Sequence, residues 1–317
     1  QKGLALNDSK LADVVEEPIL EGAEETFDAS IAAEYKKTPS SFDRSVEPPY
    51  GDSPDVNVPN VWKGELSSGM KVFGIENDEV PLVQFQIQLK GGMLLENRDK
   101  IGVSNLLADL LTKGTANKTP EELESAIESL GASINAYASK EAITISGNTL
   151  AKNYDKTMAL VQEILLEPRW DTTEFDLLKQ STLAQIERQK AQPNSIAGNQ
   201  FDKLIYGEKH ILSHDNLGTK SSVNAITMDD LKAYYDTYFS PSITKFHVVG
   251  SISQEKVTKS LADLNSKWPS KSVEFPNTPD PVAPNASKVY FYDVPGAKQS
   301  VISFGYPALA ATNTDYY

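Results

Sequence analysis

Cysteine is absent from the 317-residue sequence, which excludes disulfide bonds, thiolate nucleophiles and cysteine ligands for a metal. Histidine is scarce, with only His210, His214 and His247. No run of apolar residues approaches the ~20 that span a membrane as a helix. The 30 Lys and Arg are outnumbered by 44 Asp and Glu, and this net charge of −14 argues against a nucleic-acid partner. Serine-nucleophile elbows and Gly-rich phosphate loops are also missing.

What remains is a chain of ordinary globular composition, with 39% hydrophobic and 23% charged residues. Its length predicts about two domains. Residues 1–60 hold 13 Asp and Glu against 5 Lys and Arg, with six of the 18 prolines, which predicts an acidic extended leader or linker. Because the first residue is Gln1 and not Met, we expect a processed or truncated product. The compartment stays open, with the periplasm or cell envelope favoured over the cytoplasm.

Hydrophobic periodicity predicts a mixture of strands and helices. Apolar residues alternate with glutamines over 83–89, the pattern of a half-buried strand. The sequence Thr-Pro-Glu-Glu at 119–122 combines an N-cap, an N1 proline and a capping-box glutamate. The predicted strands are 70–76, 83–89, 133–139, 142–148, 246–251, 288–295 and 300–307; the predicted helices are one between Gly102 and Gly114, and 119–130, 154–166, 172–190, 228–238 and 254–267. The proline-rich stretch 271–287 is a predicted linker.

The helix between Gly102 and Gly114 is strongly amphipathic. Its apolar residues recur at i, i+3, i+4, i+7 and i+8 and form one stripe: Val103, Leu106, Leu107, Leu110 and Leu111. At about 100° per residue, Asn105, Ala108 and Asp109 fall on the opposite side. We therefore expect these three residues to face away from the core.

Several local patterns occur together in an order and spacing that one protein family shares. They are LSSGMKV (66–72), Gly91-Gly92 with Glu96, Gly102 followed by Lys113-Gly114-Thr115, LGASINAYAS (130–139), Tyr234-Tyr235 with Tyr238 and Pro241, and VVGS (248–251). Over about residues 62–270 the chain thereby resembles the pitrilysin (M16) zinc metallopeptidases. The resemblance implies an α+β unit, an antiparallel sheet with helices packed on one face, and the start of a second similar unit near residue 288.

Active members of that family carry His-x-x-Glu-His just before the Lys-Gly-Thr exit, with two zinc-binding histidines and a glutamate that activates water. The resemblance places the histidine positions on Asn105 and Asp109, and the glutamate position on Ala108. A further glutamate ligand falls on Gln185. One carboxylate and two amides do not make a typical zinc site. We therefore predict no catalytic residue, no metal and no other cofactor in this chain, with zinc expected in a catalytic partner or half.

Asn105 and Asp109 admit two interpretations. They are either solvated residues on a relaxed helix face, or residues that still line a cleft and help hold an extended peptide. In the family that the chain resembles, the substrate adds as a strand to an exposed sheet edge beside the helix. The edge candidate here lies in 133–139, so Ala136 and Tyr137 join Asn105 and Asp109 as candidate peptide-binding residues.

Other candidate residues have simpler interpretations. His210 and His214 are four apart, a spacing that binds metal on a helix, but they lie in a Gly-flanked segment and we favour a structural loop. His247 opens a predicted buried strand and is expected to pack. The aromatic residues Tyr234, Tyr235, Tyr238 and Phe239 are expected in the core.

Together these observations predict four segments: an acidic leader (1–60), an M16-like α+β domain (61–270), a linker (271–287) and the truncated beginning of a second M16-like domain (288–317). The expected function is that of a non-catalytic companion half or subunit, which helps a catalytic M16 half carrying the zinc motif to enclose peptides. The alternative is a structural scaffold without peptide binding. An active zinc metallopeptidase is the least favoured interpretation.

Overall fold

The computed structural model describes residues 43, 45–47, 51, 58–278, 281, 286–311 and 313–316. The predicted leader over 1–60 therefore lies almost entirely outside the described residues. The chain divides into Gln1–Asn57 and Val58–Tyr317, and all the helices and strands named below belong to the second of these units.

The centre of the unit is a six-stranded sheet with the strand order β1-β2-β6-β3-β5-β4. The strands are β1 (Trp62–Glu65), β2 (Lys71–Glu76), β3 (Leu82–Lys90), β4 (Ser133–Ala138), β5 (Ala142–Leu150) and β6 (Thr244–Gly250). Neighbouring strands are antiparallel except β2 and β6, which are parallel. The prediction of a purely antiparallel sheet is corrected at this pair, because β6 returns to the sheet after the helical segments and not through a hairpin.

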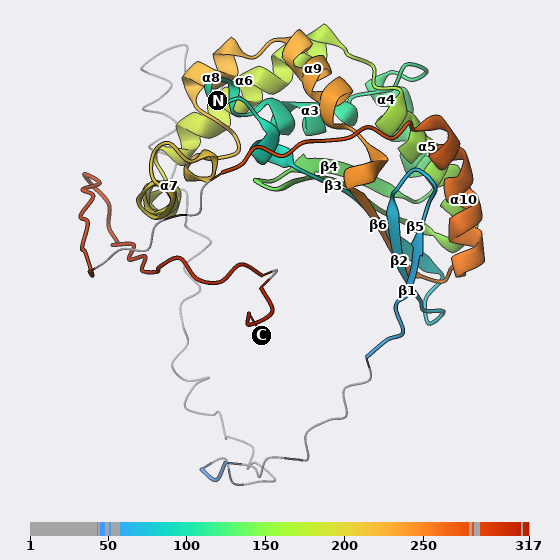
Figure 1. The fold of residues 1–317 in the computed structure, drawn as a ribbon, viewed down its shortest axis with the longest axis horizontal. Coiled ribbons are helices and arrows are strands. Elements are labelled where there is room, and N and C mark those ends of the chain that lie inside the picture. Colours follow the sequence, from blue (N-terminus) through green and yellow to red (C-terminus); the bar gives the residue numbers. More distant parts are fainter. Residues whose placement is uncertain are drawn as a thin grey trace, which may run out of the picture. The chain divides into compact units, whose positions relative to one another are not determined.

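The helices lie to one side of the sheet and curve around its end (Figure 1). They are α3 (Val103–Leu111), α4 (Pro120–Ser129), α5 (Tyr154–Leu166), α6 (Thr172–Gln189), α7 (Pro193–Tyr206), α8 (Lys220–Ala225), α9 (Met228–Tyr238) and α10 (Gln254–Lys267). Short 3-10 turns join them, among them η1 (Gly92–Leu95), η2 (Arg98–Lys100), η3 (Ala151–Asn153), η4 (Ile211–Ser213) and η5 (Pro241–Ile243). This arrangement confirms the predicted α+β class.

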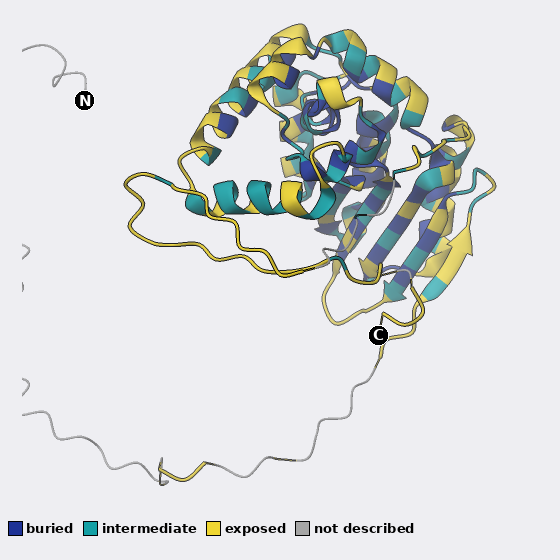
Figure 2. Cartoon of the chain, turned by 60° about the vertical axis from the view of Figure 1, so that its left-hand side comes forward, coloured by how far each residue is buried: buried dark blue, intermediate teal, exposed yellow. Residues whose placement is uncertain are grey.

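The alternating pattern of the strands explains why one face of the sheet is covered. In β3, Val83, Phe85, Ile87 and Leu89 are buried in the main core, whereas Gln84 is exposed and Gln86 and Gln88 are half-buried. Strand β6 repeats the alternation, with Phe246 and Val248 buried. The striping is visible along the strands in Figure 2, where buried and more exposed residues alternate. Since side chains alternate across a strand, the apolar half of each strand packs against the helices.

The predicted elements within residues 70–267 are all present, and the Thr119 capping box forms with Glu122 as expected. Three elements were not predicted. Strand β1 has only four residues. Pro193, interpreted as the end of the preceding helix, is also the first residue of α7, since proline suits the N1 position as well as a helix stop. Helix α8 has only six residues and begins at a capping box formed by Thr219 and Ser222.

The predicted strands at 288–295 and 300–307 are wrong, because no strand forms among residues 286–311. Their apolar side chains are exposed, with Val289 at 98%, Ile302 at 84% and Phe304 at 92%. A strand needs a neighbour for its N–H and C=O groups, and the described part of the chain pairs no strand with this segment. The described residues of the predicted linker, 271–278 and 281, contain no helix or strand.

Candidate functional site at helix α3 and edge strand β4

The chain enters α3 through two glycines in left-handed conformations. Gly92 has φ 54°, and a side chain there would approach Ser139 O to 2.3 Å. Its carbonyl accepts a hydrogen bond of 2.8 Å from the Tyr234 hydroxyl. Gly102, the N-cap of α3, has φ 112°, and a side chain would approach Leu217 O to 2.8 Å. Only glycine fits these two positions. This explains why Gly92 and Gly102 occur in the sequence pattern around α3.

Glu96 caps the N-terminus of α3 from the loop before it. Its carboxylate accepts the Gly102 N–H at 2.8 Å and the Ser104 N–H at 2.6 Å. Burial raises the pKa of Glu96 to about 7, against the opposing effect of these hydrogen bonds. The two bonds satisfy donors that a helix otherwise leaves unpaired. The role of Glu96 is therefore to position the helix that holds the candidate site.

Helix α3 is covered on more sides than its sequence pattern predicts. It packs against β4, α6, α9 and η1, and Ala108 is fully buried, at 0% exposure. The expectation that Ala108 faces away from the core is therefore wrong. A helical periodicity identifies the most apolar face, but it does not say what covers the opposite one. Here the second layer consists of helices from later in the sequence.

Asn105 and Asp109 are both half-buried on α3. The Asn105 side-chain amide donates to the Asp109 carboxylate at 3.4 Å, one helical turn away. Burial raises the pKa of Asp109 to about 6, and the nearby Lys113 acts in the opposite direction. The two side chains are therefore partly covered and hydrogen-bonded to each other, and both interpretations of the pair stay predictions.

Gln185 lies on α6, the helix that packs against α3, and is exposed. No hydrogen bond joins it to Asn105 or Asp109. The residues at these positions therefore do not fit a zinc ion: they offer one carboxylate and two amides, and Ala108 supplies only a buried methyl group. Across the residues that the structure describes, no cluster of three or more His, Asp or Glu side chains is arranged to hold a metal ion.

Strand β4 is an outer strand of the sheet and lies against α3. The Ser139 N–H donates to Ala142 O at 2.8 Å, so Ser139 and Ala142 form a hydrogen-bonded pair. From that pair on, hydrogen-bonded and non-hydrogen-bonded residue pairs alternate along β4 and β5. The N–H and C=O groups of Tyr137 point toward β5, whereas those of Ile134 and Ala136 point away from it. Among the described residues no backbone partner is found for the N–H and C=O groups of Ile134 and Ala136. The Tyr137 side chain is 49% exposed.

Several other residues singled out from the sequence make structural contacts. The His210 Nδ1 accepts the Leu212 N–H at 3.1 Å, and His247 stacks on Phe73 with ring centroids 5.2 Å apart. Tyr234 and Phe239 are buried in the core, and Tyr235 donates to Leu165 O at 2.7 Å. The core and packing predictions are confirmed for these residues. The sequence identified Glu96 only as part of the pattern with Gly91-Gly92. Its capping hydrogen bonds to Gly102 and Ser104 depend on how the loop before α3 folds back.

Two family models match the chain. The model of the insulinase family, peptidase family M16, matches residues 71–214, and the model of the peptidase M16 inactive domain matches residues 225–317. The chain therefore belongs to peptidase family M16. The two matched regions build one sheet, since β6 from the second region pairs with β2 and β3 from the first.

This chain matches a curated relative and solved structures of similar fold over only part of their length. The probable mitochondrial-processing peptidase subunit beta of Arabidopsis thaliana is 22% identical over 67% of this chain and 40% of its own length. A crystal structure of a peptidase M16 inactive domain from Pseudomonas fluorescens has a TM-score of 0.67 at 24% identity, over 72% of this chain and 55% of that one. The periplasmic protease PqqL from Escherichia coli has a TM-score of 0.64 at 19% identity, over 73% and 26%. The chain thus spans about half or less of each relative.

Proposed function

We propose that this chain is a non-catalytic M16 homologue, a companion half or subunit that helps enclose peptides together with a catalytic partner carrying the zinc motif. The observation that carries the proposal is the composition of the α3 site. Ala108 cannot accept a proton from water, and Asn105, Asp109 and Gln185 do not make a zinc ligand set. The zinc of the assembly would belong to the partner. The Arabidopsis relative is itself a subunit by name.

Peptide binding is proposed at the free edge of β4. Extended peptides bind to exposed sheet edges through main-chain hydrogen bonds. Ile134 and Ala136 offer such groups, and α3 with Asn105 and Asp109 lies directly beside the strand. Tyr137 projects from the other face of the strand, where its exposed ring can contact a bound peptide.

We also propose that residues 61–270 act as one domain, with 271–287 as a linker and 288–317 as the beginning of a second M16-like domain. The sheet and its helices end with α10 at Lys267. The exposed apolar side chains of 289–306 suit a segment that packs within a further unit. None of the helices in the described part of the chain is long and apolar enough to cross a bilayer.

The test is binding and hydrolysis of an unfolded polypeptide, for which fluorescein-labelled oxidised insulin B chain serves as the probe. We expect saturable binding by fluorescence anisotropy and no cleavage by mass spectrometry. Dialysed protein should hold far less than one equivalent of zinc. Ala136→Pro removes an outward N–H without removing a bond to β5, and should weaken binding about fivefold or more.

The matched control is Lys63→Pro at the opposite edge of the sheet. The Leu66 N–H donates to Met70 O at 2.9 Å, so Leu66 and Met70 form a hydrogen-bonded pair. Because such pairs alternate along β1 and β2, the N–H and C=O groups of Lys63 point away from β2, as those of Ala136 point away from β5. This variant should bind as tightly as the wild type. Equal weakening by both proline variants would contradict an edge site on β4. Stoichiometric zinc with peptide cleavage would contradict the non-catalytic role, and absence of binding would favour a scaffold.

A further inference from the structure

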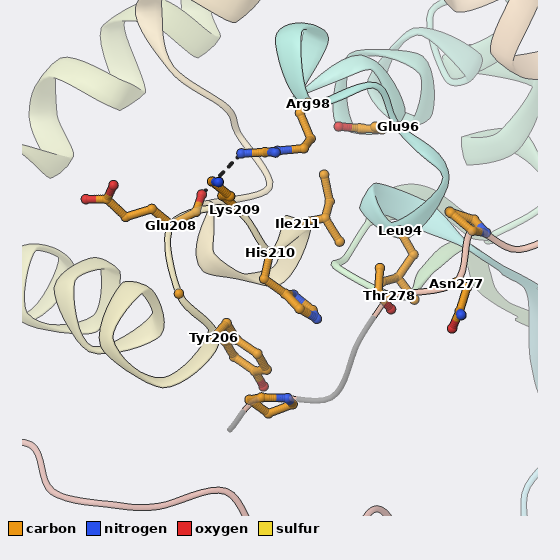
Figure 3. Close-up of a pocket in the computed structure, with 13 residues that line it drawn as sticks. Leu94, Glu96, Arg98, Tyr206, Glu208, Lys209, His210, Ile211, Asn277 and Thr278 are labelled. Carbon is orange, nitrogen blue, oxygen red and sulfur yellow. Dashed lines mark hydrogen bonds between the residues drawn. The ribbon is translucent and has the colours of Figure 1, made fainter. Parts of the chain in front are cut away.

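A cavity of about 650 Å³ lies beside the N-terminal end of α3, where Glu96 lines it, and is built from three separate parts of the chain. The first part is the η1–η2 loop with Leu94 and Arg98, and the second is the stretch from the end of α7 to η4 with Tyr206, His210 and Ile211. The third part includes Thr278, after the last helix (Figure 3). Its volume lies within the range of roughly 300–1,000 Å³ that is typical of small-molecule sites.

The lining combines apolar side chains with hydrogen-bond donors. Leu94 and Ile211 are apolar, while Arg98, His210 and Tyr206 carry polar ends. The Leu212 N–H donates to His210 Nδ1 at 3.1 Å, so in the neutral ring the proton lies on Nε2, which is then a donor. The rings of Tyr206 and His210 pack with centroids 5.1 Å apart, which fixes the position of the imidazole.

Two cations, Arg98 and Lys209, and two carboxylates, Glu96 and Glu208, line the cavity, although the whole chain carries −14. The Arg98 guanidinium donates to Glu208 O at 3.3 Å and keeps its other N–H groups. The Glu208 side chain extends away from the other labelled side chains in Figure 3, and the Glu96 carboxylate is occupied in capping α3. Beside the cavity, the pKa of His214 is lowered by burial and by the charges of Arg98, Lys203 and Lys140.

We propose that this cavity binds an apolar carboxylate, a hydrophobic group with a free carboxylate, whose apolar body lies over Leu94 and Ile211 and whose carboxylate meets Arg98 and His210. The C-terminal residue of a peptide and a small free acid share this chemistry. Arginine binds carboxylates in a planar, two-bond geometry. The site is separate from the β4 edge and does not depend on peptide enclosure there.

The experiment is calorimetric titration of the whole chain with four probes: N-acetyl-L-phenylalanine, its amide, and a decapeptide ending in phenylalanine with a free or an amidated C-terminus. Because a charge-assisted hydrogen bond is lost, each amide should bind about tenfold more weakly than its acid. Tighter binding of the free peptide than of the small acid would assign a peptide C-terminus. Binding of the small acid alone would assign a free acid. Equal affinity for acids and amides, or no saturable binding, would overturn the proposal.

Variants locate the binding. Arg98→Met should weaken the acid probes about tenfold and leave the amides unchanged. Thr278→Trp fills the cavity from a residue outside any helix or strand, so the fold is kept while all four probes are excluded. Lys256→Met, which removes an exposed cation on α10, is the control and should bind like the wild type. Wild-type affinity in Arg98→Met, or an equal loss in Lys256→Met, would contradict the assigned site.

Discussion

Strand β3 and residues 300–307 share an alternating apolar pattern, but only one of them is a strand. In β3, the apolar residues are buried under the helices, and both edges of the strand pair, with β5 and with β6. In 300–307, Ile302 and Phe304 are 84% and 92% exposed, and no strand forms. An alternating pattern therefore specifies which face of a strand is apolar. It does not supply the neighbouring strands or the covering layer that make the strand stable.

The same contrast applies to the stability of the two regions. Helices cover the apolar face of the sheet. Each large side chain buried between them therefore contributes to the free energy of folding. Residues 286–311 have no regular structure and make few such contacts. Substitutions in the two regions should therefore differ strongly in effect.

The largest effect is expected for Phe246→Ala in β6. Phe246 is fully buried, at 0% exposure, in the centre of the sheet. The loss of its ring leaves a cavity and should lower the free energy of unfolding by about 3–5 kcal/mol. Urea denaturation followed by circular dichroism measures this change. A loss below about 1 kcal/mol would mean that the core described here is not the stable part of the molecule.

An intermediate effect is expected from the pH dependence of Glu96. Its pKa of about 7 in the fold lies above the ordinary value of 4.5, so the folded state holds the proton more tightly than the unfolded chain. Stability from this group is complete below about pH 4.5 and is lost as the pH rises through 7. The loss between pH 5 and pH 8 should be about 2–3 kcal/mol. Denaturation at both pH values measures it.

Glu96→Gln should remove most of this pH dependence, although it also weakens the cap, because the two N–H groups bond to different carboxylate oxygens and in Gln one of these is replaced by an NH2 donor. The control is Glu121→Gln, an exposed position at the start of α4, which should keep the wild-type slope. An unchanged slope in Glu96→Gln would show that the carboxylate does not titrate as the buried cap described here.

The smallest effect is expected for Phe304→Ser. Since Phe304 is 92% exposed, its replacement should change the free energy of unfolding by less than about 0.5 kcal/mol. Phe246→Ala in the same assay provides the comparison. A large destabilisation by Phe304→Ser would show that residues 300–307 pack in solution as a strand, and the contrast with β3 would disappear.

Local signals predicted most of the fold. Caps such as Thr119 with Glu122, and the alternation in β3, act between residues close in the sequence and are readable from it. The site was predicted only in part. The edge position of 133–139 agrees with the place of β4 in the sheet, while peptide binding at Ala136, Tyr137, Asn105 and Asp109 stays a prediction. Ala108 was wrongly expected to face away from the core, because α6 and α9, which cover α3, come from later in the chain.

The sequence by itself determined where α3 begins and which of its faces is most apolar, whereas the assignment of Asn105, Ala108, Asp109 and Gln185 to former zinc-site positions comes from the family resemblance and stays a prediction. The start and the apolar face of α3 depend on residue identity and on helical spacing. The tertiary structure decided that Ala108 is buried, that Glu96 caps α3, and that Arg98, Tyr206 and His210 meet around one cavity. Each of these depends on which distant segments pack together. Packing follows from the burial of apolar surface across the whole unit, and no local pattern records it.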